Sequence, residues 1–193
     1  MTSEPGTGMA PSLTETLAGY MGRTPDENAD LERMRPLLET GDPWDRDTLF
    51  HFTGSALIVH PPTQRVLLRW HEGQGAWLQV GGHADPGETR PLEVALREGV
   101  EETALPDLVA WPDSALLHAV VVPVPASDRE PAHEHADLRF VLATDQPEAA
   151  RPEKPGAPVR WLSLDEARAA TGEDNLRETL DRLEGLLARP VAG

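Results

Sequence analysis

Three glutamates, Glu98, Glu101 and Glu102, have the residue type and the spacing of a cation site. At positions i, i+3 and i+4 of a helix, their side chains project from one face and lie next to one another. Like charges at this spacing repel, and no basic residue stands on the same face to balance them. The face therefore lacks a positive charge, and a hard divalent cation with oxygen ligands, Mg²⁺ or Mn²⁺, is the simplest one to supply it.

The segment that carries these acids reads as a glycine-rich loop followed by a helix. Pro91 suits the first helical turn, where its missing N–H costs nothing. Arg97 lies beside the acidic face, within reach of Glu93 and Glu101 along the helix. Small and apolar residues recur with the period of a helix that buries one face: Leu92, Ala95, Leu96, Gly99, Val100 and Thr103. On the acids alone, an ordinary solvent-exposed acidic face is the simpler interpretation.

The spacing of the whole segment is more specific than the acids alone. The Nudix box has the signature G-x5-E-x7-R-E-U-x-E-E-x-G-U, in which U is an apolar residue. Its anchor residues occur in the same order in this chain: Gly82, Glu88, Arg97, Glu98, Glu101 and Glu102. Residues 82–105 thus resemble this box, and the chain resembles a Nudix hydrolase over roughly residues 50–170. The N-terminal part of the chain lies outside the resemblance.

Three features depart from the signature. Eight residues rather than seven separate Glu88 from Arg97, so the loop must absorb one extra residue. Gly99 stands where the family has a larger apolar residue, which predicts a close approach of the helix to its sheet. Ala104 replaces the glycine after the helix, so we expect the left-handed cap at the end of the helix to be lost. None of these changes removes a carboxylate.

The resemblance implies an enzyme that cleaves a nucleoside diphosphate linked to another moiety, by attack of water at a phosphorus of the pyrophosphate. Because a pyrophosphate is strongly anionic, metal ions must neutralise it, orient it and acidify the attacking water. The ligands that the resemblance implies for Mg²⁺ or Mn²⁺ are three carboxylates and a backbone carbonyl of the glycine turn: Glu98, Glu101, Glu102 and Gly82.

The candidate catalytic residues are Glu98, Glu102 and Arg97. Some family members use the first glutamate of the helix as general base, which would be Glu98, and others use an acid from a later loop. Glu102 is the second candidate for this role. We expect Arg97 to pair with Glu88 and to brace the loop against the helix. Glu153, in a late proline-rich loop, is a further candidate acid.

A second group of polar residues lies on a strand predicted at residues 133–143. Alternation along a strand places four of them on one face, opposite an apolar face: His133, His135, Asp137 and Arg139. This face is predicted either to line a cleft, with His135, Asp137 and Arg139 binding substrate, or to face solvent. An independent His-His-Asp transition-metal site is a less favoured alternative.

Single aromatic residues and histidines elsewhere carry weaker signals. Trp77 is a candidate for stacking on a base of the substrate, and a core tryptophan is the competing interpretation. His71 and His83 are interpreted more readily as structural residues than as ligands.

Composition limits the class of partner. The chain has 193 residues and a formal net charge of −16, which argues against a nucleic-acid polymer or an anionic membrane as partner. A small phosphorylated substrate stays compatible with this charge when metal ions screen its phosphates. With no cysteine, the chain has no disulfide framework and no thiol nucleophile. The N-terminus has no secretory pattern and no run approaches transmembrane length, so we expect a soluble, cytoplasmic protein.

The remaining pattern predicts an α/β fold with an N-terminal extension. We expect disorder at 1–11, a helical extension at 12–48 whose second helix ends at Gly41, and the hydrolase domain with its C-terminal helix at 49–193. The extension is predicted to pack on the domain, and a dimerisation arm of a homodimer is the alternative. Strands are expected at 50–59, 65–70, 76–80, 115–124, 133–143 and 159–162. Such an order describes a mixed sheet between helices, and the resemblance implies the Nudix-type α/β/α sandwich.

Three functions from different classes stay open at this stage. A metal-dependent pyrophosphohydrolase is favoured. The alternative is a catalytically weak Nudix-like domain that binds a nucleotide, which the inserted loop residue would allow. An isomerase of the isopentenyl-diphosphate type shares the fold but uses a cysteine, which this chain lacks. The box specifies only the pyrophosphate, so the identity of the attached group is not predicted.

Overall fold

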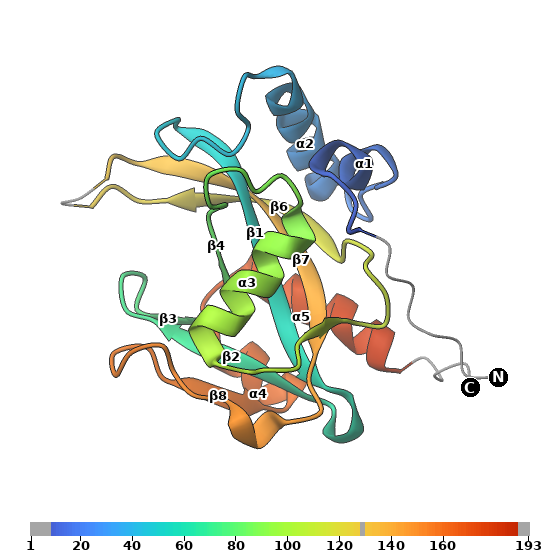
Figure 1. Ribbon diagram of the computed structural model, residues 1–193, viewed down its shortest axis with the longest axis vertical. Helices are drawn as coiled ribbons and strands as arrows, with labels where there is room; N and C mark the ends of the chain where they lie inside the picture. The colour runs from blue at the N-terminus through green and yellow to red at the C-terminus, as the bar shows by residue number, and fades with distance from the viewer. Residues whose placement is uncertain (1–8, 128–129, 189–193) are drawn as a thin grey trace.

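The long parallel pair of β1 (Phe50–His60) and β7 (His133–Ala143) forms the centre of a mixed sheet (Figure 1). The structure is a computed structural model that describes residues 9–127 and 130–188. Strands that pair antiparallel with β1 are β2 (Arg65–His71) and β4 (Val80–Gly82). Those that pair with β7 are β5 (Val109–Ala110) and β6 (His118–Val124), and those that pair with β2 are β3 (Ala76–Leu78) and β8 (Val159–Leu162).

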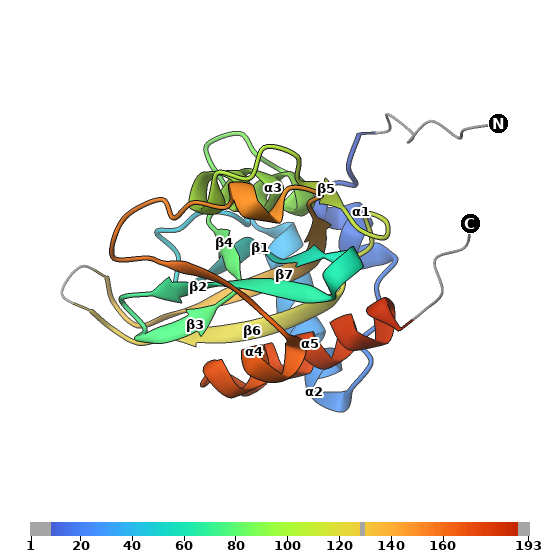
Figure 2. The same cartoon turned by 90° about the horizontal axis from the view of Figure 1, so that it is seen from below.

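Helices cover both faces of this sheet (Figure 2). On one face lies α3 (Pro91–Thr103), and on the other lie α4 (Leu164–Ala170) and α5 (Asp174–Leu187). The period of two along β1 divides its apolar side chains between the two layers: Phe52 and Ile58 join the core beneath α3, whereas Leu57 and Val59 join the core beneath α5. This arrangement confirms the predicted α/β/α sandwich.

The N-terminal extension packs on the domain through α1 (Leu13–Ala18) and α2 (Pro25–Met34). The buried leucines of both helices belong to the same core as the face of α3. Glu27 of α2 is buried, and its carboxylate pairs with Arg182 of α5 at 2.7 Å. These contacts fit the packed extension, and the homodimer stays a prediction. Disorder is predicted for residues 1–11, and residues 1–8 of this segment lie outside the described residues.

The loop of residues 83–90, which contains the extra residue, is held by this extension. The backbone N–H of Leu13 donates to the carbonyl of Thr89 at 3.2 Å, and the guanidinium of Arg90 donates to the carbonyl of Ala10. Within the loop, the N–H of Glu88 donates to the carbonyl of Asp85 at 2.9 Å, which closes a turn. The approach to α3 is therefore fixed from two sides.

The structure corrects several predicted boundaries. Helix α2 ends at Met34 and continues only as a 3₁₀ turn over Arg35–Glu39, because Pro36 lacks the N–H that an α-helix requires. The strand expected at 76–80 is broken at Gln79, and its two parts pair with different neighbours, β3 with β2 and β4 with β1. Strand β6 begins at His118 rather than at residue 115. Among the described residues, no helix is both long and apolar enough to cross a membrane.

Candidate active site

Helix α3 lies close against the sheet, as its glycine predicts. A Cβ added to Gly99 would come within 2.9 Å of Leu108 Cδ1 and 3.3 Å of Leu142 Cδ1. At the end of the helix, Ala104 itself takes the left-handed conformation, with φ 55° and ψ 18°. The expected loss of the left-handed cap is therefore wrong. The cap is kept, with a Cβ in a region that costs an L-residue roughly 1–2 kcal/mol.

Two of the acids of α3 lie directly against the glycine edge formed by Gly81 and Gly82. A Cβ on Gly82 would come within 2.5 Å of Glu98 Oε1, so this carboxylate lies directly against the glycine backbone. The backbone N–H of Gly81 donates to Glu102 Oε2 at 3.1 Å. Both carboxylates are thus aimed at the backbone of β4, where the sequence predicts a carbonyl ligand at Gly82.

Arg97 is surrounded by acids from the loop and the helix. Its guanidinium lies 2.9 Å from Glu88, 2.9 Å from Glu98, 3.1 Å from Glu101 and 3.6 Å from Asp85. The contact with Glu88 confirms the predicted brace between loop and helix, whereas Glu93 lies beside Arg90 instead, at 3.9 Å. One guanidinium among four carboxylates leaves an excess of negative charge at this end of the helix.

Glu102 has a cation partner that the sequence pattern does not reveal. Arg69 of β2 lies 3.0 Å from Glu102 and 3.2 Å from Glu153. The expectation that no cation balances the acids is therefore wrong for Glu102, which Arg69 reaches from β2. The contact of Arg97 with Glu101 is the one that the helical spacing predicts. Burial nevertheless outweighs the attraction of Arg69 and raises the pKa of Glu102 to about 7. Burial also raises the pKa of Glu98.

The donor set of this face fits a hard divalent cation. It offers carboxylate oxygens and a glycine backbone, without sulfur or nitrogen donors, which is the ligand chemistry of Mg²⁺ and Mn²⁺. Carboxylates whose charged form is disfavoured by burial gain most from a nearby positive charge. The close packing of Glu98 on Gly82 places this carboxylate beside the glycine backbone.

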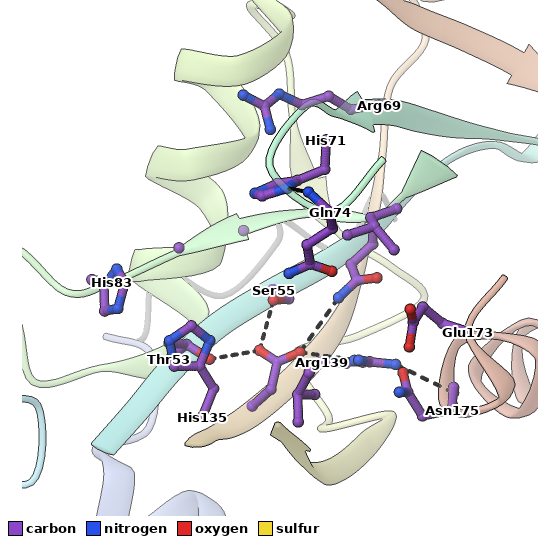
Figure 3. A pocket seen from close by; sticks show the side chains of 16 residues that line it. Thr53, Ser55, Arg69, His71, Gln74, His83, His135, Arg139, Glu173 and Asn175 are labelled. Carbon is purple, nitrogen blue, oxygen red and sulfur yellow. Dashed lines mark hydrogen bonds and ion pairs between the residues drawn. The ribbon is translucent and has the colours of Figure 1, made fainter. Parts of the chain in front are cut away.

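A cavity of about 210 Å³ opens on the other side of the glycine edge (Figure 3). Its walls come from β1, β2, β4 and β7 and from the start of α5. Arg69 and the Gly81–Gly82 edge border both this cavity and the acids. Residues of the sheet that line it include Thr53, Ser55, His135, Asp137 and Arg139.

The pairing of β1 with β7 explains why this cavity is polar. In register, His51 stands beside His135, Thr53 beside Asp137 and Ser55 beside Arg139, whereas Leu57 stands beside Val141. All of these side chains point to the face that α5 covers only in part. The apolar halves of both strands lie under α5, and the polar halves form the cavity.

Asp137 and Arg139 lie where the alternation places them, yet they also bind each other. Asp137 accepts hydrogen bonds from Ser55 at 2.6 Å, from Thr53 at 2.9 Å and from Arg139 at 2.8 Å. Only 4% of Asp137 and 2% of Arg139 is exposed, so the solvent-facing alternative does not hold. Arg139 also donates to Thr179 of α5 at 2.9 Å. The pair therefore ties the sheet to α5 at the floor of the cavity.

Comparison with known proteins assigns the family. Residues 50–183, more than half of the chain, match the family model described as NUDIX domain. The chain belongs to the Nudix family. The extension at 12–48 lies outside the match, and comparison with curated proteins finds no match.

Solved structures share the fold of this Nudix domain. An Ap4A hydrolase of C. elegans in a binary complex has a TM-score of 0.57 and 17% identity, with 73% of this chain and 98% of that chain covered. The dihydroneopterin triphosphate pyrophosphohydrolase of E. coli has a TM-score of 0.53 and 19% identity, with 70% and 94% covered. RenU, a Nudix hydrolase of M. smegmatis, has a TM-score of 0.52 and 20% identity, with 74% and 89% covered.

The family match confirms the predicted Nudix hydrolase at the level of family and generic function. Enzymes of this family generally use a divalent metal. The identity of the ion and of the substrate, and the roles of the predicted site residues, stay predictions for this chain.

Some residues of this Nudix site differ from those that the sequence pattern singles out. Trp77 does not line the cavity; the guanidinium of Arg160 lies over its ring, 4.6 Å from the centroid. Arg69 and Gln79 do line it, and each has a buried polar atom without a hydrogen-bond partner, Nε of Arg69 and Oε1 of Gln79. A signal for Arg69 exists in the sequence, since a charged residue ends the apolar run Val66-Leu67-Leu68.

Proposed function

We propose that this Nudix enzyme is a Mg²⁺- or Mn²⁺-dependent pyrophosphohydrolase that acts on a small phosphorylated molecule, a nucleoside diphosphate linked to another moiety. The observation that carries the proposal is the placement of acids and cavity on the two sides of one glycine edge. Gly81 and Gly82 have no side chains, so a phosphate chain that starts in the cavity reaches the carboxylates across them. Arg69 spans the same boundary.

The residues that would hold the cation are three carboxylates and a backbone carbonyl: Glu98, Glu101, Glu102 and Gly82. Bound there, Mg²⁺ or Mn²⁺ supplies charge neutralisation at the pyrophosphate and acidifies the attacking water. Glu101 is the most exposed of the three acids, with 54% of its side chain accessible, so it borders solvent. Glu98 and Glu102 lie deeper, against the backbone of β4.

The general base is assigned to Glu102 or Glu98. A carboxylate accepts a proton from water most effectively when its pKa lies near the working pH. In the metal-free protein, burial raises the pKa of Glu102 to about 7 and moves that of Glu98 in the same direction; because a bound cation lowers the pKa of its own ligands, the base would be whichever of the two acids the cation leaves unligated. Arg97 holds the loop of the box to the helix through Glu88 and through the carbonyl of His83, to which it donates at 2.7 Å.

The cavity side of the site is suited to a compact polar group. Its volume of about 210 Å³ lies below the roughly 300–1,000 Å³ of pockets that enclose a drug-sized ligand, so it takes a base or a sugar rather than a whole dinucleotide. The unpaired Nε of Arg69 offers a donor and the unpaired Oε1 of Gln79 offers an acceptor. A ligand that supplies the complementary pair of groups would satisfy both atoms.

The two enzymes named above for their substrates, an Ap4A hydrolase and a dihydroneopterin triphosphate pyrophosphohydrolase, act on different molecules. A substrate screen is therefore the direct test. Nucleoside triphosphates, oxidised nucleotides, dinucleoside polyphosphates and nucleotide sugars are incubated with the enzyme and Mg²⁺ or Mn²⁺, and the phosphorylated products are identified. Cleavage in ¹⁸O-labelled water shows which phosphorus is attacked. Turnover that needs the metal and is lost in Glu102→Gln supports the proposal.

One observation favours the second candidate, a nucleotide-binding domain with weak catalysis. Arg97 and Arg69 already engage the carboxylates of Glu98 and Glu102, so a cation must compete with both guanidiniums. In that case calorimetry detects nucleotide binding while no metal supports turnover of any compound in the screen. That result would replace the hydrolase by the binding function.

A further inference from the structure

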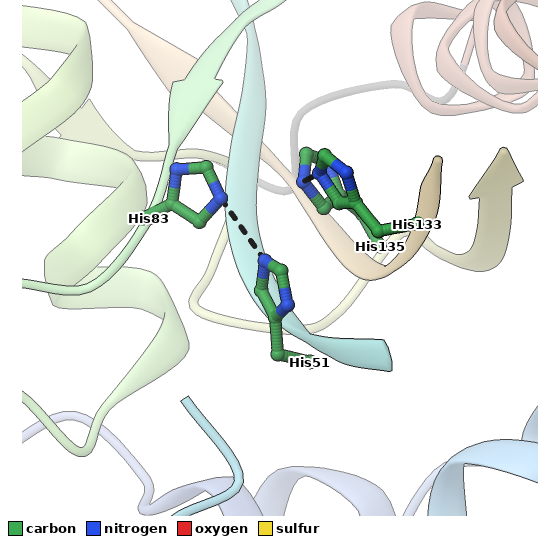
Figure 4. Close-up of side chains that lie close together, drawn as sticks. All are labelled: His51, His83, His133 and His135. Atoms are coloured by element: carbon green, nitrogen blue, oxygen red, sulfur yellow. Dashed lines mark hydrogen bonds between the residues drawn. The ribbon is translucent and has the colours of Figure 1, made fainter. Parts of the chain in front are cut away.

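Four histidines that lie far apart in the sequence come together beside the cavity (Figure 4). One ring nitrogen of each lies within 4.8 Å of the corresponding atoms of the other three: His51, His83, His133 and His135. In the part of the chain that the structure describes, this group has the nitrogen donors of a transition-metal site and includes no carboxylate. Its members come from β1, β7 and the residue that follows β4, whereas the acids belong to α3.

Strand pairing brings the four rings to one place. His51 of β1 stands beside His135 in the parallel register with β7, and His133 precedes His135 by two residues and therefore projects from the same face. Gly82 stands opposite Gly54 of β1, so the chain that leaves β4 delivers His83 next to the same strand end. The cluster is a consequence of the sheet topology.

The spacing of the rings approaches that of a tetrahedral ion. His83 Nε2 lies 3.0 Å from His51 Nε2, and His133 Nε2 lies 3.1 Å from His135 Nε2. Metal–nitrogen bonds of about 2.0–2.1 Å in a tetrahedron place the ligand nitrogens about 3.3–3.4 Å apart. The two close pairs need to open by only a few tenths of an ångström, and the remaining separations contract from at most 4.8 Å.

Two of the rings are already oriented as ligands. Nδ1 of His51 lies 2.9 Å from the carbonyl of Thr48, and Nδ1 of His133 lies 2.9 Å from the carbonyl of Pro131. Because a carbonyl oxygen only accepts, each Nδ1 carries the hydrogen, and each Nε2 turns a lone pair toward the cluster. Metal-binding histidines commonly donate their other ring N–H to such a carbonyl.

The remaining two rings, His83 and His135, contact each other edge to face, with ring centroids 4.9 Å apart. Both border the cavity beside the glycine edge. A second cavity, of about 190 Å³, is bordered by His83 and His133.

We propose that the four histidines form a binding site for a transition-metal ion of the Zn²⁺ type, separate from the acidic site. Four imidazoles suit Zn²⁺, Co²⁺, Ni²⁺ or Cu²⁺ and are poor ligands for Mg²⁺, which prefers oxygen. A site with four protein ligands and no open position is structural rather than catalytic. The ion would join β1, β7 and the start of the box loop.

Such an ion would position the acidic site through the backbone of His83. The carbonyl of His83 accepts a hydrogen bond from Arg97 at 2.7 Å, and Gly82 is its direct neighbour in the chain. Fixing the ring of His83 therefore also fixes the residue that packs against Glu98. This role is independent of which phosphorylated molecule the enzyme cleaves.

The test is a titration of chelator-treated protein with Co²⁺, followed in the visible spectrum. Four-coordinate Co²⁺ absorbs much more strongly than six-coordinate Co²⁺ bound by oxygens, so the two sites are distinguishable without an activity assay. We expect an intense band that saturates at one equivalent and is displaced by Zn²⁺, together with a higher melting temperature in the presence of Zn²⁺. Absence of the intense band would overturn the proposal.

Matched variants assign the band to the histidines. His133→Gln, at the accessible rim, should weaken Co²⁺ binding by about tenfold or more, and His133→Gln combined with His135→Gln should abolish the band. His60→Gln, whose ring contacts Thr63 outside the cluster, should leave the band unchanged. Glu98→Gln should also retain it. A band that survives the double histidine variant, or that disappears in Glu98→Gln, would place the ion elsewhere. Melting curves without metal check that each variant is folded. If the double variant is unfolded, the Co²⁺ affinity of His133→Gln alone decides whether the band belongs to the histidines.

Discussion

Replacing Glu102 with glutamine separates the charge of this residue from its size. The side chain is 10% exposed, accepts a hydrogen bond from the N–H of Gly81 and lies 3.0 Å from Arg69. Glutamine keeps the volume and retains an oxygen that can accept the bond from Gly81. What changes is one negative charge in a buried position.

The pKa of Glu102 gives the magnitude and the sign of the effect on stability. The rise from an ordinary value of 4.5 to about 7 corresponds to about 3 kcal/mol, taken as a ceiling. Because the pKa is raised in the folded state, the contribution of Glu102 to the stability of the metal-free wild-type protein is largest below pH 4.5 and is lost as the pH rises through about 7. Glu102→Gln carries no such loss, so its stability relative to wild type should increase over the same interval.

Denaturant unfolding with a chelator present, at several pH values between 5 and 8, measures this difference. Glu93→Gln, on the same helix with 49% of its side chain exposed, is the matched control for the charge change. A constant difference between Glu102→Gln and wild type across this range would refute the reasoning on burial. With Mg²⁺ and substrate, loss of a main electrostatic stabiliser should lower activity by roughly a hundredfold or more. A fully active Glu102→Gln would remove the charge from the mechanism.

Three further substitutions test other parts of the site. Ala104→Gly should raise the free energy of unfolding by about 1 kcal/mol, because glycine takes a φ of 55° without the Cβ penalty; an unchanged denaturation midpoint would argue against the left-handed cap. Arg97→Ala should lower both the melting temperature and kcat, since four carboxylates lose their common cation; a variant with a normal melting temperature would not fit the brace. Asp137→Ala should destabilise the protein by about 3–5 kcal/mol, because it leaves the buried Arg139 unpaired. A stable Asp137→Ala with impaired turnover would instead restore the purely substrate-binding role expected from the sequence.

The local sequence pattern was sufficient to predict the helices and strands whose apolar residues recur with a single period. The apolar stripe and Pro91 predict α3, and β7 has the bounds that its alternation indicates. The contact of Arg97 with Glu88 also follows from the box. In each case the information lies within a short stretch of chain.

The contacts that depend on which strands are neighbours were not predictable in this way. Arg69 reaches Glu102 because β2 lies beside β1, and the sequence around either residue does not indicate the other as its partner. The break at Gln79 has the same origin, since the chain changes partner there from β2 to β1. The histidine cluster needs the β1–β7 register, which places His51 next to His135. Each histidine considered alone gives no such signal.

The pair of Glu27 and Arg182 has a consequence for how the chain reaches its native state. The two residues are 155 positions apart, so their contact can form only after synthesis has passed Arg182. Until then the carboxylate that α2 will bury has no guanidinium partner. A shortened chain that begins at residue 50 would keep every residue of the box, yet it would leave Arg182 with Glu178 as its acidic partner on α5. The extension thus makes completion of the domain depend on the presence of both α2 and α5.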